Sequence, residues 1–388
     1  MSVSPLTARP PVAAVEPAKE TAPTDEPRAL STRSVDDVAS VVGSALGSLA
    51  LTWIVYSLLL PLSGVLGFLI CWYVAFLVMY ACVAALSHPR PIVISKLMSV
   101  VMTSAAAIVG FALVTVVAYT VGKGLKALLH VSFFTRDMAG VGPTTPLGHG
   151  GIWHAIVGSF IMLGIAVAVS LPFGLATAVF MTEVGGWFAK VVRTIVEAMT
   201  AVPDLLAGLF VYVTLIVGLG WERTGLAAAI AISVTMIPII ARSAEVALRV
   251  VPGGLREAGQ ALGASHWQTV RRVVLPTARP GLATALILAM ARGVGETAPL
   301  LIVSGASTYL NANPTKGPMN SLPLFIYSAI RSPDELTIQR GFAAAVVLLA
   351  VVFVLFAITR FVAFFAIKRF LTKRKTREMT SPADLWTG

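Results

Sequence analysis

The sequence predicts an all-α integral membrane protein with about eight transmembrane helices, and three observations support this class. Of the 388 residues, 57% are hydrophobic and only 12% are charged, about half the charged fraction of an ordinary soluble domain. The apolar residues fall in long runs, which is typical of membrane spans. The formal net charge of +11 requires no nucleic acid partner, because membrane proteins concentrate Lys and Arg on their cytoplasmic side.

Eight apolar stretches are long enough to cross a bilayer at ~1.5 Å of rise per helical residue. They cover residues 40–60, 65–86, 97–120, 152–182, 195–218, 225–241, 282–304 and 342–367. The first two are separated by little more than residues 61–64, which predicts a tight helical hairpin. We find no internal repeat along the chain.

The segments outside the spans complete the predicted domain organisation. Residues 1–37 are rich in Pro, Ala, Ser, Thr and charge, a composition typical of a disordered tail. We therefore divide the chain into this cytoplasmic tail, an N-terminal transmembrane hairpin at 38–96, a transmembrane domain at 97–367 and a basic cytoplasmic tail at 368–388.

The distribution of basic residues predicts the orientation of the chain in the membrane. With the N-terminus inside, the inner segments hold 20 of the 29 Lys and Arg residues, and the outer segments hold seven. This bias follows the positive-inside rule for membrane proteins. We therefore expect both termini in the cytoplasm.

Motifs for catalysis or metal binding are not found in the sequence. Gly122-Lys123-Gly124 comes closest to a phosphate-cradling loop, but it lacks the upstream glycine and the following Ser or Thr. The five histidines do not form a metal cluster by spacing. We expect a transporter subunit rather than an enzyme, with any ATP hydrolysis carried out by a separate chain.

The inner loop at 242–281 is the longest between spans, and its sequence predicts a structured element rather than a linker. Pro252-Gly253-Gly254 interrupts the preceding helix. A helix rich in small residues is predicted over 255–264. A second, basic helix is predicted from Trp267 to Val274, ending at Leu275-Pro276.

The spacing of residues in this loop matches a known pattern. Its anchors are Glu257, Ala258, Gly263, Leu275 and Pro276, with Gly259 and Val273 in place of the usual Ala and Ile. The segment at 252–276 resembles the EAA loop of binding-protein-dependent ABC importers. The resemblance implies coupling to an ATPase through Arg256, Glu257, Ala258 and Gly263. The alternative is an ordinary connection with routine positive-inside arginines.

The physical properties of the loop agree with this resemblance. Small residues allow a short helix to enter a cleft on a partner protein. Glu257 can pair with a basic residue in that cleft, and Gly263 permits a sharp turn between the two helices.

The span at 282–304 carries a charged pair near the middle of the membrane. Arg292 lies ~15 Å into the span, where an arginine costs at least ~2.5–3.5 kcal/mol. Glu296 lies on the same helix face four residues later. With Thr297, the pair is predicted to line a polar substrate pathway, because a guanidinium can donate two parallel hydrogen bonds to a phosphate. The alternative is a structural ion pair buried between helices.

Two further inferences follow from this pair. Glu296 can accept a hydrogen bond from a protonated phosphate oxygen, which sulfate at neutral pH does not offer. Arg292 and Glu296 nominally cancel in charge, so we expect a partner permease to contribute at least one more intramembrane arginine to an anion site.

The wider sequence resembles one family of permeases. Residues 292–301 read Arg-Gly-Val-Gly-Glu-Thr-Ala-Pro-Leu-Leu, which is similar to the G-E-T-A-P-L-L stretch of phosphate ABC transporter permease subunits of the PstA type. Shorter matches in the expected order are Gly150-Gly151-Ile152, Leu171-Pro172-Phe173-Gly174, Val202-Pro203 and Ser321-Leu322-Pro323-Leu324. The resemblance covers roughly residues 97–367.

This resemblance implies a fold and a function. The fold is the type I ABC importer permease core of six helices, here with an added N-terminal two-helix hairpin. The function is import of inorganic phosphate across the bacterial plasma membrane. The implied partners are a second permease (PstC-like), an ATPase dimer (PstB-like) and an extracytoplasmic phosphate-binding protein (PstS-like). No cofactor is implied in this chain, since ATP and Mg are bound by the ATPase subunits.

Other interpretations stay open at this point. A permease for another substrate, such as molybdate or a peptide, belongs to the same class. An ion-coupled secondary transporter usually shows an internal repeat and has no use for an EAA loop. Arg242, Glu245 and Arg249 follow the span at 225–241, where interfacial snorkelling is favoured over a gate. The outer segment at 305–341 is large enough to receive a binding protein.

Overall fold

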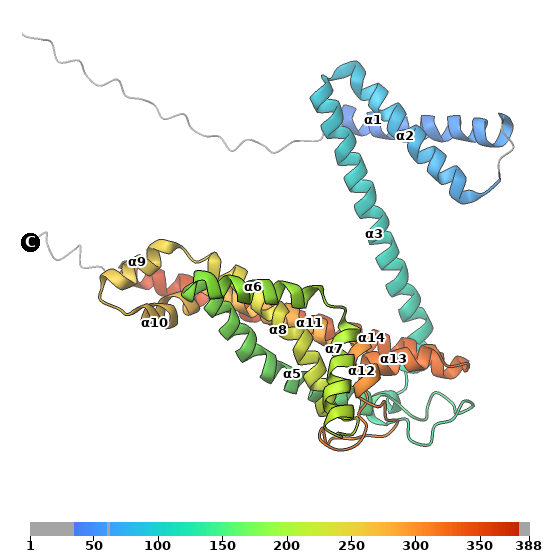
Figure 1. Cartoon of the computed structure of the whole chain (residues 1–388). Helices are drawn as coiled ribbons and strands as arrows, with labels where there is room; N and C mark the ends of the chain where they lie inside the picture. The colour runs from blue at the N-terminus through green and yellow to red at the C-terminus, as the bar shows by residue number, and fades with distance from the viewer. Residues whose placement is uncertain (1–34, 60–62, 380–388) are drawn as a thin grey trace, which may run out of the picture. The chain divides into compact units, whose positions relative to one another are not determined.

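The computed structural model describes residues 35–59 and 63–379 (Figure 1). Most of the predicted N-terminal tail, half of the turn predicted at 61–64 and the last part of the predicted basic tail lie outside these ranges. Every named element in the described residues is a helix, with one isolated bridge between Gly305 and Met319 as the single extended pairing there. The predicted all-α class is confirmed.

Two compact units make up the chain, and the boundary between Ala112 and Leu113 falls inside a helix. The first unit contains α1 (Val35–Trp53) with the π-helical turn η1 (Ile54–Leu59), α2 (Val65–Ser87) and the first part of α3 (Arg90–Leu128). Helices α1 and α2 pack against each other, and the indole Nε1 of Trp72 donates to the Ala45 carbonyl at 3.2 Å. Lys96 pairs with Asp37 at 2.6 Å, which ties α3 to the start of α1.

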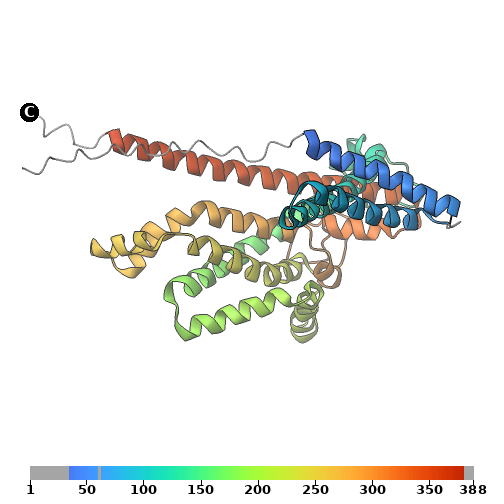
Figure 2. The ribbon, with the colours of Figure 1, turned by 90° about the horizontal axis from the view of Figure 1, so that it is seen from above.

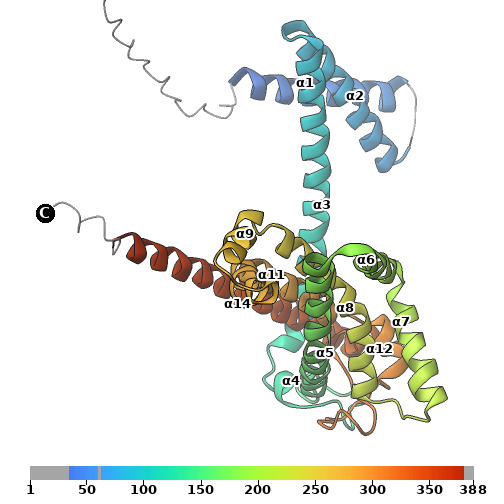
Figure 3. The same ribbon diagram turned by 60° about the vertical axis from the view of Figure 1, so that its left-hand side comes forward.

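The second unit is built around one enclosed helix, α8 (Gly225–Arg249). An apolar stretch of 18 residues in α8 is 61% buried, against 28% or less for the corresponding stretch in each of the other spans. It packs along α5 (Trp153–Val179) and α11 (Leu275–Val294), and Figures 1 and 3 show the three helices side by side. A Cβ at Gly174 would lie 2.7 Å from the Ile240 Cβ, so glycine is needed for this close approach. Small residues serve the same purpose in membrane helix packing generally.

The span predicted at 195–218 is broken in two. Helix α6 (Gly186–Ala201) and helix α7 (Asp204–Val211), with its π-helical extension η3 (Tyr212–Gly218), meet at an angle of 100°. Pro203 supplies the physical reason, because a proline disfavours helical geometry at the residue before it. Val202 is extended, with φ −70° and ψ 129°. Within residues 35–59 and 63–379, seven apolar helices are long enough to span, or eight if the bent pair counts as one span.

Two predictions were wrong: the end of the basic helix at Leu275-Pro276 and the continuous span at 282–304. The basic helix does not end at Leu275-Pro276: α10 (His266–Thr269) and the π-helical turn η4 (Val270–Val274) run directly into α11, and residues 266–294 form one spanning helix. Pro276 is tolerated because it falls in the first turn of α11. At the other end, α11 stops at Val294, and a separate short helix, α12 (Ala298–Val303), follows.

The remaining elements of this unit lie at the two ends of the helix bundle. Helix α9 (Gly253–Ala261) and the turn η2 (Phe180–Val184) after α5 share one end (Figure 2). At the opposite end lie α4 (Ser132–Thr135) and α13 (Leu322–Ile330), where the Met138 N–H donates to the Thr308 carbonyl at 2.9 Å. The last helix, α14 (Glu335–Met379), is longer than the predicted span at 342–367.

Candidate functional site

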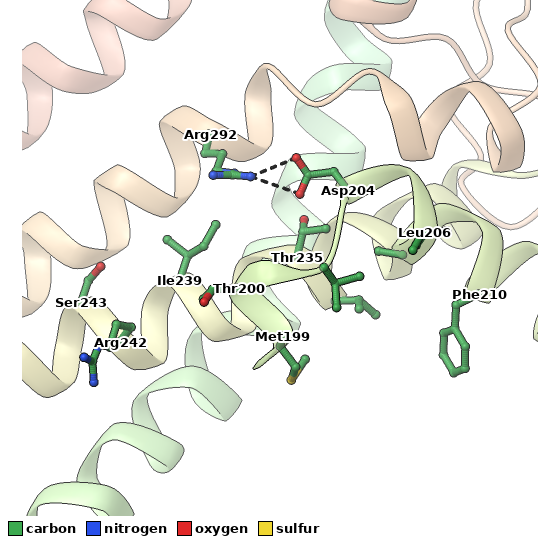
Figure 4. Close-up of a pocket in the computed structure, with 13 residues that line it drawn as sticks. Met199, Thr200, Asp204, Leu206, Phe210, Thr235, Ile239, Arg242, Ser243 and Arg292 are labelled. Atoms are coloured by element: carbon green, nitrogen blue, oxygen red, sulfur yellow. Dashed lines mark hydrogen bonds and ion pairs between the residues drawn. The ribbon is translucent and has the colours of Figure 1, made fainter. Parts of the chain in front are cut away.

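A cavity of about 460 Å³ opens between the broken helix pair α6–α7 and the helices α8 and α11 (Figure 4). Its polar lining includes Asp204 at the start of α7, Arg292 from the last turn of α11, and Arg242 and Ser243 from α8. The rest of the wall is mainly apolar, with side chains such as Phe210. The cavity therefore presents two arginines and one carboxylate in apolar surroundings.

Arg292 is held between two carboxylates. Its Nη2 lies 3.1 and 2.9 Å from the two carboxylate oxygens of Asp204, as the dashed lines in Figure 4 mark. Its Nε lies 3.5 Å from Oε1 of Glu296. The side chain of Arg292 is 53% exposed, that of Asp204 is 33% exposed and that of Glu296 is 8% exposed. The guanidinium therefore faces the open cavity, while Glu296 supports it from the protein interior.

The broken helices explain how these three side chains meet. Asp204 begins α7 directly after Pro203, and an acidic residue is favoured at a helix N-terminus. Arg292 lies in the last turn of α11, where a basic residue is favoured. Gly208 of α7 packs closely on Pro299 of α12, since a Cβ at Gly208 would lie 2.5 Å from the Pro299 Cα. The two breaks thus bring opposite helix ends together beside the cavity.

The three residues predicted to line the substrate pathway, Arg292, Glu296 and Thr297, differ in their position relative to the cavity. Arg292 lines the cavity, and its predicted pairing with Glu296 is present. The hydroxyl of Thr297 instead contacts the backbone of its own turn, with Oγ1 3.4 Å from the Gly295 carbonyl, and Thr297 does not line the cavity. Asp204 was not predicted. Glu197 and Asp204 are the two acidic residues within the apolar stretch at 195–218, and they were the available signal, because ionisable residues inside membrane spans are functional candidates by default.

A second ion cluster surrounds Glu245 near the end of α8. This carboxylate is 1% exposed and accepts from Arg193 at 2.7 Å, Arg242 at 2.9 Å and Arg249 at 2.6 Å. Arg242 also lies 3.2 Å from Glu197. Snorkelling was the favoured interpretation for this segment, but it does not describe Glu245, which is buried. Three arginines compensate the cost of removing its charge from water.

Within the connection at 250–266, helix α9 is followed by a four-residue turn, 262–265, before α10 begins at His266. Helix α9 ends in a Schellman motif: the Gly263 N–H donates to the Gln260 carbonyl at 2.9 Å, and the Ala264 N–H to the Gly259 carbonyl at 3.2 Å. Gly263 has φ +82°, a conformation that favours glycine. Ser265 then begins α10 with a capping box completed by Gln268. The turn predicted at Gly263 is therefore present.

The four predicted coupling residues divide between the two faces of α9. Glu257, Ala258 and Gly263 are exposed, beside Leu262, which is 89% exposed. Arg256 turns the other way, and its Nη2 lies 2.9 Å from Oε1 of Glu183. The exposed face carries the small and apolar residues that a partner can cover, while Arg256 is engaged within the chain.

Comparison with known proteins gives consistent matches over this unit. Residues 170–369 match the family described as "Binding-protein-dependent transport system inner membrane component". The "Phosphate transport system permease protein PstA 1" of Mycobacterium tuberculosis strain H37Rv is 37% identical over 233 residues, which are 60% of this chain and 75% of the relative. The PstA protein of Mycobacterium leprae is 36% identical over 62% of this chain and 79% of its own length. That of Haemophilus influenzae is 34% identical over 54% and 73%. The family match includes the lining of the cavity and the connection at 250–266.

Proposed function

Because the chain belongs to the family of binding-protein-dependent transport system inner membrane components, we propose that it is the phosphate-specific permease subunit of an ATP-driven importer. Membership makes it a multi-pass protein of the inner membrane and a transport component rather than an enzyme, as the sequence predicted. The proposal adds the substrate, the energy source and the partners. Relatives named as phosphate permeases at 34–37% identity support the substrate.

The observation that carries the proposal is the position of Arg292. Its guanidinium faces the cavity, and its Nη2 contacts both oxygens of a carboxylate. Two oxygens of a phosphate can replace those of Asp204, because a planar guanidinium suits both groups in the same way. Glu296 can then accept a hydrogen bond from a protonated phosphate oxygen, a contact that fully ionised sulfate does not offer.

The charge of the site supports a shared substrate pathway. Arg292 stands against two carboxylates, so the cluster carries a formal charge of −1 when all three groups are ionised. Arg242, the other cavity arginine, is paired with Glu245 and Glu197. We expect a second, PstC-like permease to supply at least one further arginine, since this chain alone does not make a positive site.

The energy source is proposed to act through the connection at 250–266. A PstB-like ATPase dimer, which binds the ATP and Mg, is expected to cover the exposed face that includes Glu257, Ala258 and Gly263. A PstS-like binding protein is expected to deliver phosphate at the opposite end of the bundle. Both termini are expected in the cytoplasm, in agreement with the positive-inside bias.

The test is uptake of radiolabelled phosphate into vesicles that hold the full complex. We expect ATP-dependent uptake that arsenate inhibits and sulfate does not. Arg292→Ala should abolish uptake while the complex still assembles and hydrolyses ATP. The matched control Arg279→Ala removes an exposed arginine from the same helix outside the cavity and should transport normally.

Each alternative function has its own outcome in this experiment. ATP-dependent uptake of molybdate or of a peptide, with no uptake of phosphate, would assign another substrate. Uptake that continues without ATP and follows an ion gradient would assign a secondary transporter. Normal uptake by Arg292→Ala would make the arginine structural and shift the anion site to the partner permease.

A further inference from the structure

The guanidinium of Arg256 joins three segments at the end of the bundle that carries α9. Toward the turn after α5, its Nη2 and Nε lie 2.9 and 3.3 Å from the two carboxylate oxygens of Glu183. Toward the end of α8, its Nη2 donates to the Leu248 carbonyl at 3.1 Å and its Nη1 to the Val251 carbonyl at 2.8 Å. All three nitrogens of the group are therefore engaged within the chain.

Glu183 is also held in place by burial of its side chain and by a contact of its backbone carbonyl. Its side chain is 4% exposed, so its charge depends on Arg256 for compensation. Its backbone carbonyl lies 3.1 Å from Nε2 of His266, the first residue of α10. One residue later, η2 ends at Val184, and Gly185 and Gly186, with φ values of +67° and +79°, turn the chain directly into α6. Glu183 is thus a fixed point at the end of α5.

We propose that Arg256 and Glu183 form a latch that fixes α9 to the end of α5, so that a movement of α9 displaces α5 directly. Both residues are positioning residues rather than contacts for the ATPase. Without the latch, α9 is connected along the chain to α8 before it and α10 after it, and it packs against α10 and η4. With the latch, a movement of α9 also displaces α5. Helix α5 packs along α8, which forms part of the cavity wall.

This inference rests on the proposed function, since it takes α9 as the surface that the ATPase moves. A purely structural ion pair predicts something different. Its loss would lower the stability or the amount of the complex and leave the number of substrate molecules moved per ATP unchanged. Loss of a latch would lower that ratio in complexes that still assemble and hydrolyse ATP.

The experiment uses the full complex in vesicles and measures phosphate uptake and ATP hydrolysis in the same preparation. The variants are Glu183→Gln, Arg256→Gln and the double variant, with Arg279→Gln as the matched exposed control. We expect each single variant to hydrolyse ATP within about twofold of the wild type, while uptake per ATP falls about tenfold. The double variant should be no worse than the worse single variant, because both changes remove the same contact.

A second measurement makes the test independent of transport. Hydrogen exchange at residues 253–261 should be faster in both single variants and unchanged in Arg279→Gln, because α9 loses its fixed point. If the glutamine variants do not assemble, Arg256→Lys retains the charge without the forked donors, and Glu183→Asp retains the carboxylate on a side chain shorter by one methylene. An intermediate fall in uptake per ATP is expected for both.

Two results would overturn the latch. One is a wild-type ratio of uptake to ATP hydrolysis in the variants that assemble. The other is an additive loss in the double variant, which would show that the two residues act separately. If the wild-type complex moves a different substrate, the phosphate assignment fails, while the ratio for that substrate and the exchange at α9 still decide the latch.

Discussion

The two ion clusters that include Arg292 and Glu245 use the same residue types for different purposes. At the cavity, one arginine that is 53% exposed faces two acids. At the end of α8, one glutamate that is 1% exposed is surrounded by three arginines. An exposed arginine with more than one acidic partner can exchange a carboxylate for a ligand at little cost in desolvation. A buried carboxylate cannot lose its partners without leaving an uncompensated charge. Exposure therefore separates a site that can bind from one that holds helices together.

The largest effect is expected when the buried cluster is broken. Glu245→Ala should lower the free energy of unfolding by ~1.5–3 kcal/mol, since it removes the hydrogen bonds of a buried carboxylate that Arg193, Arg242 and Arg249 share. Thermal unfolding of the purified protein and its amount in the membrane would both report the loss. The control is Glu197→Ala, whose carboxylate is 52% exposed, with an expected cost below ~1 kcal/mol. Equal effects of the two variants would contradict the distinction.

The next effect concerns function rather than stability. Arg292→Lys retains the charge in the cavity but loses the forked pair of donors. We expect phosphate uptake to fall at least about tenfold, ~1.4 kcal/mol, while the unfolding free energy changes by less than ~1 kcal/mol, because the side chain is half exposed. Uptake kinetics and thermal unfolding on the same preparation test this. A large loss of stability with normal uptake would make this cluster structural as well.

A change in the opposite direction is expected at the acid that competes with the ligand. Asp204→Asn removes a negative charge beside Arg292 and weakens the internal partner of its guanidinium. The KM for phosphate should fall by up to about tenfold, which corresponds to ~1.4 kcal/mol. Measuring KM against pH separates a role of Asp204 as a competitor for Arg292 from a role in binding phosphate. A rise in KM would show that Asp204 binds the substrate itself.

The smallest effect is expected at the turn after α9. Gly263→Ala places a Cβ in open space but forces a left-handed conformation at φ +82°, which costs ~1–2 kcal/mol for a non-glycine residue. Hydrogen exchange at 253–266 should become faster, without a change in the rest of the bundle. Gly254→Ala, where glycine has neither a positive φ nor a close neighbour, is the control and should be neutral.

A charged side chain at the same turn tests function rather than local stability. We expect Gly263→Asp to leave the protein inserted and to uncouple uptake from ATP hydrolysis.

The sequence by itself determined the features that depend on neighbouring residues. Long apolar runs gave the membrane class and most of the helices, because hydrocarbon selects for run length regardless of the rest of the fold. The pairing of Arg292 with Glu296 joins residues only four positions apart, although Glu296 lies just beyond the end of α11. The turn at Gly263 follows from the conformational freedom of glycine. Each of these was predicted correctly because its cause lies within a few residues.

Only the tertiary structure decided which distant residues meet. Asp204 lies 88 residues from Arg292, Glu183 lies 73 residues from Arg256, and Arg193 lies 52 residues from Glu245. None of these pairs leaves a periodic signal in the sequence, since each depends on the angle and depth at which two helices pack. That packing is set by small residues such as Gly174 and by the break before Asp204, whose 100° bend turns a predicted span into one wall of the cavity. The pairings follow from helix packing, which local periodicity does not encode.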